Sequence, residues 1–209
     1  MAEIYLVTDE GLLSGKDLAT TVAEAVRGGV GMVQLREKES STRLFVERAA
    51  ALKRLLAPLG VPLIINDRVD VALAADADGV HVGQSDMPPA LVRRLLPPGK
   101  IVGLSVESPQ QVLDAEGLDV DYIAASPVFA TPTKTDTRIE WGLEGLRWIR
   151  LHSRHRLVAI GGIKPGNAAD IVRAGASSLA VVSGICSAAD PCGAARLYKR
   201  IADEAEREA

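Results

Sequence analysis

Short apolar runs alternate with longer helical segments along the whole chain, and no other feature restricts the fold as strongly. Eight such runs occur, at residues 4–8, 31–37, 62–66, 79–83, 100–106, 122–128, 156–162 and 179–185. Strands that alternate with helices form βαβ units, in which successive strands pair in parallel. Eight units predict a single-domain (β/α)8 TIM barrel over residues 1–209, with an open, doubly wound sheet as the alternative.

The composition is typical of such a barrel. Hydrophobic residues make up 47% of the chain, but aromatic residues only 3%. The core must therefore be built from Ala, Val, Leu and Ile, as in parallel strands covered by helices. No Pro- or Ser-rich linker divides the sequence, so we expect one catalytic domain.

Several classes of protein are disfavoured by charge, hydropathy and cysteine content. A net charge of −3 without a basic block argues against nucleic acid as a partner. No apolar run approaches the ~18 residues of a membrane span, and the first residues lack the pattern of a secretory signal. Cys186 and Cys192 are too few for a disulfide scaffold and have no zinc spacing. We therefore expect a cytoplasmic protein with reduced thiols that binds neither membranes nor nucleic acid.

Active sites of (β/α)8 barrels lie at the carboxyl ends of the strands, so polar residues there are candidates. The second run ends in "VQLREK", where a period of two places Gln34, Arg36 and Lys38 on one face. This face is either a solvated strand end or an anion clamp, in which Arg36 binds two oxygens and Lys38 supplies a point charge. The residues alone leave both interpretations open.

Two aspartates follow the next two runs. Asn66 and Asp67 come after "LII", and Asp86 follows "VHVGQS". Each aspartate is placed to cap the following helix. Alternatively, the two carboxylates meet across the mouth of the barrel, where oxygen ligands completed by substrate phosphates suit Mg²⁺.

The remaining runs contribute smaller polar groups and glycines. Ser105 is the next-to-last residue of the fifth run, Gly161 and Gly162 end the seventh, and Ser183 stands in the eighth. Barrels commonly bind phosphate between strands seven and eight, where glycine lets the backbone approach an anion. The loop "ATPTKTDT" at 130–137 follows the sixth run, between the two predicted anion sites. His81 stands mid-strand and is interpreted as a core or second-layer residue rather than a catalyst.

The ordered motifs "YLVTD", "VQLREK", "GVHVGQSDMP", "GLSVES", "SPVFATPTKTD", "AIGGI" and "VVSGI" resemble those of the thiamine-phosphate synthase family, from about residue 4 to residue 191. The resemblance implies a (β/α)8 barrel and a Mg²⁺-dependent transferase. Its substrates would be 4-amino-5-hydroxymethyl-2-methylpyrimidine diphosphate and hydroxyethyl-thiazole phosphate, or the carboxylated thiazole. The products would be thiamine phosphate and pyrophosphate.

The resemblance also implies roles for individual residues. It places Mg²⁺ on Asp67 and Asp86, and catalysis on Arg36, Lys38, Ser105 and Lys134. The pyrimidine diphosphate would contact Gln34, Arg36, Lys38, Asn66, Ser105 and Lys134. The thiazole phosphate would contact Thr131, Thr133, Gly162, Val182 and Ser183. It further implies a homo-oligomer, although no pattern in the sequence locates an interface.

Two other functions remain as alternatives within this fold. One is a thiazole tautomerase-like paralogue, and the other is a barrel that senses thiamine phosphates without turning them over. Either would be expected to lack part of the metal and diphosphate set. Arg36, Lys38, Asp67, Asp86 and Lys134 are all present, which favours the synthase.

Overall fold

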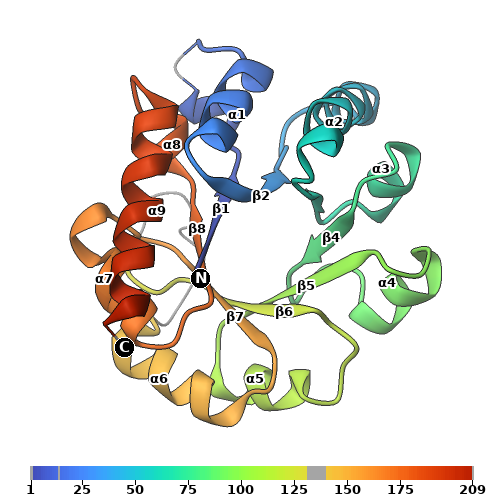
Figure 1. The fold of residues 1–209 in the computed structure, drawn as a ribbon. Helices are drawn as coiled ribbons and strands as arrows, with labels where there is room; N and C mark the ends of the chain where they lie inside the picture. Colours follow the sequence, from blue (N-terminus) through green and yellow to red (C-terminus); the bar gives the residue numbers. More distant parts are fainter. Residues whose placement is uncertain (1, 14, 131–139, 209) are drawn as a thin grey trace.

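The computed structural model describes residues 2–13, 15–130 and 140–208. Its parallel strands form a closed barrel in which each strand neighbours the next and β8 returns to β1 (Figure 1). The strands are β1 (Glu3–Val7), β2 (Val30–Leu35), β3 (Leu63–Asn66), β4 (Gly79–Val82), β5 (Ile101–Val106), β6 (Tyr122–Ala125), β7 (Arg156–Ile160) and β8 (Ser178–Val181). Closure through the pair Ile4–Leu179 confirms the barrel and excludes the open sheet.

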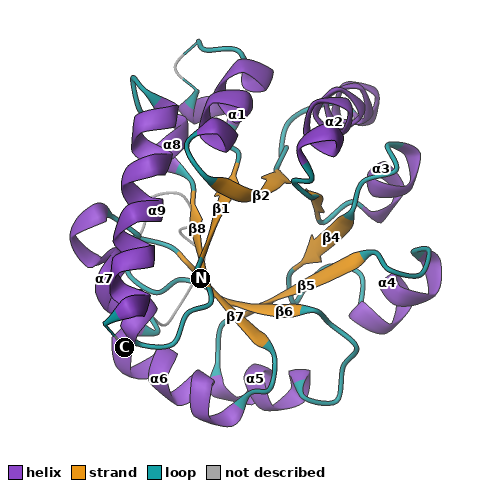
Figure 2. Cartoon of the chain, viewed as in Figure 1, coloured by secondary structure: helices purple, strands orange, loops and turns teal. Residues whose placement is uncertain are grey.

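Helices surround the strands (Figure 2). They are α1 (Leu18–Arg27), α2 (Thr42–Leu56), α3 (Val69–Ala74), α4 (Pro89–Leu95), α5 (Pro109–Ala115), α6 (Gly142–His152), α7 (Pro165–Arg173), α8 (Ser183–Cys186) and α9 (Pro191–Arg207), with short 3-10 turns η1 (Glu10–Leu12) and η2 (Ala57–Leu59). Several begin at a side chain that accepts a backbone N–H, as Asp17 does for α1 and Ser41 for α2. None of the helices among the described residues is long and apolar enough to cross a membrane.

The two-residue period of the strands separates two cores. Outward side chains such as Ile4, Leu6 and Val33 are fully buried in the large apolar cluster that the strands share with the helices. Inward side chains form a second, smaller cluster inside the barrel: Tyr5, Val7, Met32, Ile64, Tyr122, Ala124, Val158 and Ala180. The barrel interior is therefore a packed core, and a cavity lies above it, at the carboxyl ends of the strands.

Several of the expected strands end before their apolar runs do, and the sixth, for example, ends at Ala125 rather than at residue 128. The seventh ends at Ile160, because Gly161 and Gly162 have positive φ angles of 98° and 67°. The eighth ends at Val181, because Val182 leaves the extended conformation and Ser183 begins α8. Apolar residues return directly after each turn, at Ile163 and Ile185, so hydropathy alone does not locate the strand ends.

Candidate active site

A cavity of about 550 Å³ lies at the carboxyl ends of the strands. Every predicted site residue that the structure describes lines it: Gln34, Arg36, Lys38, Asn66, Asp67, Asp86, Ser105, Gly162, Val182 and Ser183. Thr131, Thr133 and Lys134 lie outside the described residues. Side chains from separate strand ends are thus brought into one pocket by closure of the barrel.

Two cations of this pocket, Arg36 and Lys38, follow β2. The Arg36 side chain is only 17% exposed, and its Nη1 lies 3.1 Å from Asp9 Oδ2. The Arg36 backbone N–H also donates to Thr8 Oγ1 at 3.1 Å, which attaches the end of β2 to the residue after β1. A paired and largely buried guanidinium on the pocket wall favours the anion clamp over the solvated strand end.

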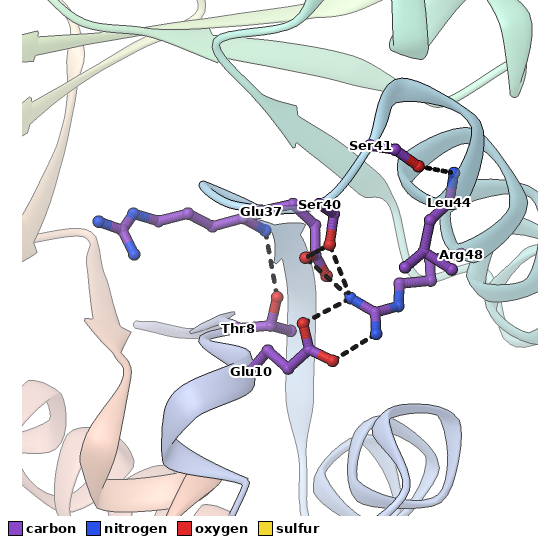
Figure 3. A network of polar contacts seen from close by, with 8 residues as sticks. Thr8, Glu10, Glu37, Ser40, Ser41, Leu44 and Arg48 are labelled. Atoms are coloured by element: carbon purple, nitrogen blue, oxygen red, sulfur yellow. Dashed lines mark hydrogen bonds and ion pairs between the residues drawn. The ribbon is translucent and has the colours of Figure 1, made fainter.

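Glu37 stands between the two cations in sequence but points away from the pocket, towards α2 (Figure 3). Its Oε2 accepts from Arg48 Nη1 at 2.8 Å and from Ser40 Oγ at 2.7 Å. Arg48 also binds Glu10, so one guanidinium joins α2, η1 and the loop after β2. The Glu37 side chain is 4% exposed, and its burial holds the loop in place while its sequence neighbours Arg36 and Lys38 line the cavity.

The two predicted metal ligands do not cap helices. The N-cap residues of α3 and α4 are Arg68 and Pro88, and neither helix has a side-chain cap. Asp86 Oδ2 instead accepts from the Gly83 backbone N–H at 2.7 Å, within the loop after β4. Asp67 has a left-handed backbone, with φ 63°, directly after β3. Such strain in a non-glycine residue is typical of functional sites, and here the carboxylate lines the cavity.

The two carboxylates lie close enough to disturb each other. Burial raises the pKa of Asp67 from 3.8 to about 6, and Asp86 adds to the shift, whereas Lys38 and Asn66 lower it. No group of three or more His, Cys, Asp or Glu suited to a metal ion occurs in the described part of the chain. A pair of carboxylates that repel each other fits Mg²⁺, which commonly takes one or two carboxylates and completes its shell with phosphate oxygens and water.

The opposite wall of the cavity comes from β7 and β8. A Cβ added to Gly162 would lie 2.7 Å from Phe129 Cβ, so this glycine permits the loop after β6 to approach. That loop is also held by hydrogen bonds from Val128 N–H to Ile160 O (2.9 Å) and from Phe129 N–H to Gly161 O (3.2 Å). Gly162 therefore packs directly against Phe129, in the loop that follows β6.

The interpretation of His81 as a buried residue is confirmed, but its surroundings were not predicted. The ring is 7% exposed and also reaches the cavity, with Nε2 2.9 Å from Ser105 Oγ and Nδ1 3.0 Å from Tyr122 Oη. Tyr5, Gln84 and Lys164 line the cavity as well and were missed. A two-residue period separates Tyr5 from Ile4 and Leu6, but the face that points inward and the partners of Tyr5 became identifiable only once the barrel closed.

Fold and pocket together define a class: a (β/α)8 barrel whose cavity combines cations, a carboxylate pair and a glycine-lined wall at the carboxyl ends of its strands. Residues 4–185 match the family model described as thiamine monophosphate synthase. The chain therefore belongs to the thiamine monophosphate synthase family.

Individual relatives agree with this assignment. Thiamine-phosphate synthase of Albidiferax ferrireducens is 57% identical over 200 residues, covering 96% of this chain and 91% of the relative. The Vibrio campbellii protein of the same name is 52% identical, covering 90% and 92%. The solved structure of thiamine phosphate pyrophosphorylase from Pyrococcus furiosus superposes with a TM-score of 0.90 at 37% identity, covering 98% of this chain and 96% of that one.

Proposed function

We propose that this protein is a thiamine-phosphate synthase, a transferase that joins a pyrimidine diphosphate to a thiazole phosphate and releases pyrophosphate. The observation that carries the proposal is the arrangement of the cavity. Arg36, Lys38, Asp67 and Asp86 lie in the same cavity as Gly162 and Ser183 of the opposite wall. Such a cavity suits two phosphorylated substrates, one of which needs a metal ion.

The cationic wall is assigned to the pyrimidine diphosphate, with contacts from Gln34, Arg36, Lys38, Asn66, Ser105 and Lys134. Lys38 lies near enough to Asp67 to lower its pKa, which supports a shared site for diphosphate and metal. The thiazole phosphate is assigned to the other wall, with contacts from Thr131, Thr133, Gly162, Val182 and Ser183. This arrangement would hold the two reactants side by side, so that the bimolecular reaction becomes effectively unimolecular.

The proposed chemistry breaks the bond between the pyrimidine methylene carbon and the diphosphate oxygen first. The electron pair leaves with pyrophosphate, and the thiazole nitrogen then donates its lone pair to the carbocation to form the new C–N bond. Arg36, Lys38 and Lys134 donate to the leaving oxygens as negative charge develops there, and one such donor contributes about 3–4 kcal/mol. Asp67 and Asp86 would hold Mg²⁺, which would supply further neutralisation of the diphosphate charge.

The proposal includes small-molecule substrates, a cytoplasmic location and a homo-oligomer, with neither membrane nor nucleic acid as partner. Cys186 is buried, Cys192 is partly buried, and neither forms a disulfide. Size-exclusion chromatography with light scattering measures the oligomeric state.

The direct test supplies purified protein with both substrates and Mg²⁺. We expect equimolar thiamine phosphate and pyrophosphate, separated by chromatography and quantified. Omission of the thiazole phosphate should prevent formation of thiamine phosphate. A folded, metal-supplied protein that forms no thiamine phosphate would exclude the synthase and leave the paralogue or the sensor.

A further inference from the structure

Five side chains form a continuous row of hydrogen bonds across the floor of the cavity. Gln34 Nε2 lies 2.7 Å from Tyr5 Oη, and Tyr5 Oη lies 2.9 Å from Tyr122 Oη. Tyr122 Oη lies 3.0 Å from His81 Nδ1, and His81 Nε2 lies 2.9 Å from Ser105 Oγ. The row starts and ends at residues assigned to the pyrimidine diphosphate, whereas the three residues between them have no assigned role.

The two phenols in the row keep their protons. Tyr5 is 1% exposed and Tyr122 is 3% exposed. Burial raises the pKa of both well above the ordinary value for tyrosine, because a phenolate would be poorly solvated there. Each phenol therefore has one hydroxyl proton to donate and an oxygen that accepts.

The order of donors follows from Gln34. Its amide Nε2 donates to Tyr5 Oη, and the buried Tyr5 proton then needs an acceptor. Among the partners that the structure describes, the Tyr122 oxygen provides one. Tyr122 in turn donates to His81 Nδ1, which must carry no proton. A neutral imidazole with a bare Nδ1 carries its proton on Nε2, so His81 donates to Ser105 Oγ.

The rings are held firmly enough to maintain this order. The Tyr122 ring stacks on His81, with centroids 5.5 Å apart and an angle of 15° between planes. It meets the Tyr5 ring edge-on, with centroids 6.0 Å apart. On its other side lies Gly103, where an added Cβ would be 2.1 Å from Tyr122 Cζ. The hydroxyl of Tyr122 is thus fixed between the Tyr5 hydroxyl and His81 Nδ1.

We propose that Tyr5, Tyr122 and His81 are positioning residues. Gln34 sets which atom donates and which accepts in each hydrogen bond of the row, and these three residues extend that order across the barrel to Ser105. Because Ser105 Oγ accepts from His81, its own proton points into the cavity and donates to an acceptor atom of the pyrimidine diphosphate. At the other end, the Gln34 carbonyl oxygen remains as an acceptor. The reverse order would exchange these polarities and make the floor complementary to a different ring. The role in catalysis rests on the proposed function, whereas the hydrogen-bond order is a property of the chain itself.

Nitrogen-15 NMR of histidine-labelled protein tests the order without substrate. Spectra are recorded at about pH 9, where imidazoles are neutral. Two internal references are present: His152 Nδ1 faces the Trp148 carbonyl at 2.8 Å and His155 Nε2 faces the Ala115 carbonyl at 2.9 Å, so each must carry its proton on that nitrogen. We expect the His81 pattern to match His155, with the proton on Nε2. A pattern that matches His152 would overturn the proposal.

Kinetics of Tyr122→Phe test the connection to Ser105. We expect kcat/KM for the pyrimidine diphosphate to fall about tenfold, as for one lost hydrogen bond, with KM for the thiazole phosphate changed by less than about twofold. In a Ser105→Ala background the same substitution should add less than about twofold, because its effect passes through the missing hydroxyl. If Tyr122→Phe lowers kcat/KM by the same factor in the Ser105→Ala background as in the wild type, the proposal is overturned. If Tyr122→Phe does not fold, Tyr5→Phe serves in the same cycle.

Tyr198→Phe is the matched control. Tyr198 is also buried, and its hydroxyl donates to a backbone carbonyl, that of Ile163, at 3.3 Å. It lies on α9, outside the row, and its loss should leave the His81 spectrum unchanged and both kcat/KM values within about twofold. A wild-type protein that forms no thiamine phosphate overturns the proposed function alone, because the tautomer measurement requires no turnover.

Discussion

Asp67 combines a strained backbone with a carboxyl group that is costly to ionise. It has a positive φ angle, a partly buried carboxyl and a second carboxyl, Asp86, close by. The folded state therefore binds the Asp67 proton more tightly than the unfolded chain does. It follows that ionisation of Asp67 opposes folding, and that a cation between the two carboxylates relieves this cost.

Asp67→Asn tests this prediction, and asparagine also tolerates the left-handed backbone. Without Mg²⁺, we expect the variant to be more stable than the wild type above about pH 6. The difference should shrink as the pH falls towards 3.8, where the wild-type carboxyl regains its proton in both states. Added Mg²⁺ should raise the melting temperature of the wild type and not that of the variant. Equal Mg²⁺ stabilisation of both proteins would contradict the assignment.

Single residues of the catalytic set are tested by activity. We expect Asp86→Ala and Lys134→Ala each to lower kcat by about 100-fold or more, because each removes charge stabilisation from the leaving group. The free energy of unfolding should change by less than about 1 kcal/mol, measured by urea denaturation. Asp114→Ala, at an exposed position of α5, is the control and should retain full activity. Near-normal rates for either variant would remove that residue from the set.

At the scale of elements, the loop after β2 depends on α2. Arg48 reaches from α2 to Glu37, Ser40 and Glu10, and so fixes the loop that carries Arg36 and Lys38. The loop has no regular structure of its own, and it is held by this guanidinium, by the Thr8 hydroxyl and by the ion pair of Arg36 with Asp9. The anion clamp is therefore a product of packing between elements.

Arg48→Met should destabilise the protein by about 1–3 kcal/mol, because it leaves Glu37 buried without its charged partner. The KM for the pyrimidine diphosphate should rise as the loop loses its support. The double variant Arg48→Met/Glu37→Gln should recover much of the stability, since no buried charge remains. Arg147→Met, which removes an exposed pair with Glu144 on α6, is the control and should cost less than about 0.5 kcal/mol. The free energy of unfolding is measured by urea denaturation, and KM by steady-state kinetics.

At the scale of the whole molecule, the barrel closes around its aromatic interior. Tyr5 and Tyr122 are 117 residues apart in sequence and share a hydrogen bond inside the barrel. The strand next to β6, β5, contributes Gly103, whose missing side chain leaves room for the Tyr122 ring. Tyr5 and Tyr122 therefore have two roles: their rings fill the barrel interior, and their hydroxyls form part of the hydrogen-bonded row at the floor of the pocket.

Gly103→Ala should destabilise the barrel by about 1–3 kcal/mol, since the added methyl group overlaps the Tyr122 ring. Gly166→Ala on α7 is the matched control, because nothing lies within 4 Å of its added Cβ. It should leave stability unchanged or raise it by up to about 1 kcal/mol through helix propensity. Urea denaturation compares the two, and an equal effect of both substitutions would contradict the packing argument.

The periodicity of the chain predicted eight βα units and the polar residues at their strand ends, whereas the pairing of β8 with β1 decided between a closed barrel and an open sheet. Side chains of a strand alternate between its two faces, and this alternation can be read from consecutive residues. The sequence alone therefore places Gln34 and Ser105 near strand ends that face the pocket. The family motifs then predicted which of these residues share a substrate, and the described ones do line one cavity. Strand ends at Ile160 and Val181 were not predictable, because apolar runs continue into the turns.

Tertiary structure decided everything that depends on partners distant in sequence. Asp67 and Asp86 were as compatible with helix caps as with a metal pair until α3 and α4 were seen to begin without them. The support of the β2 loop by Arg48 and the row from Gln34 to Ser105 depend on contacts between separate elements. Periodicity records only which face a residue occupies, whereas the direction of a hydrogen bond depends on the atom that closure of the barrel places opposite it.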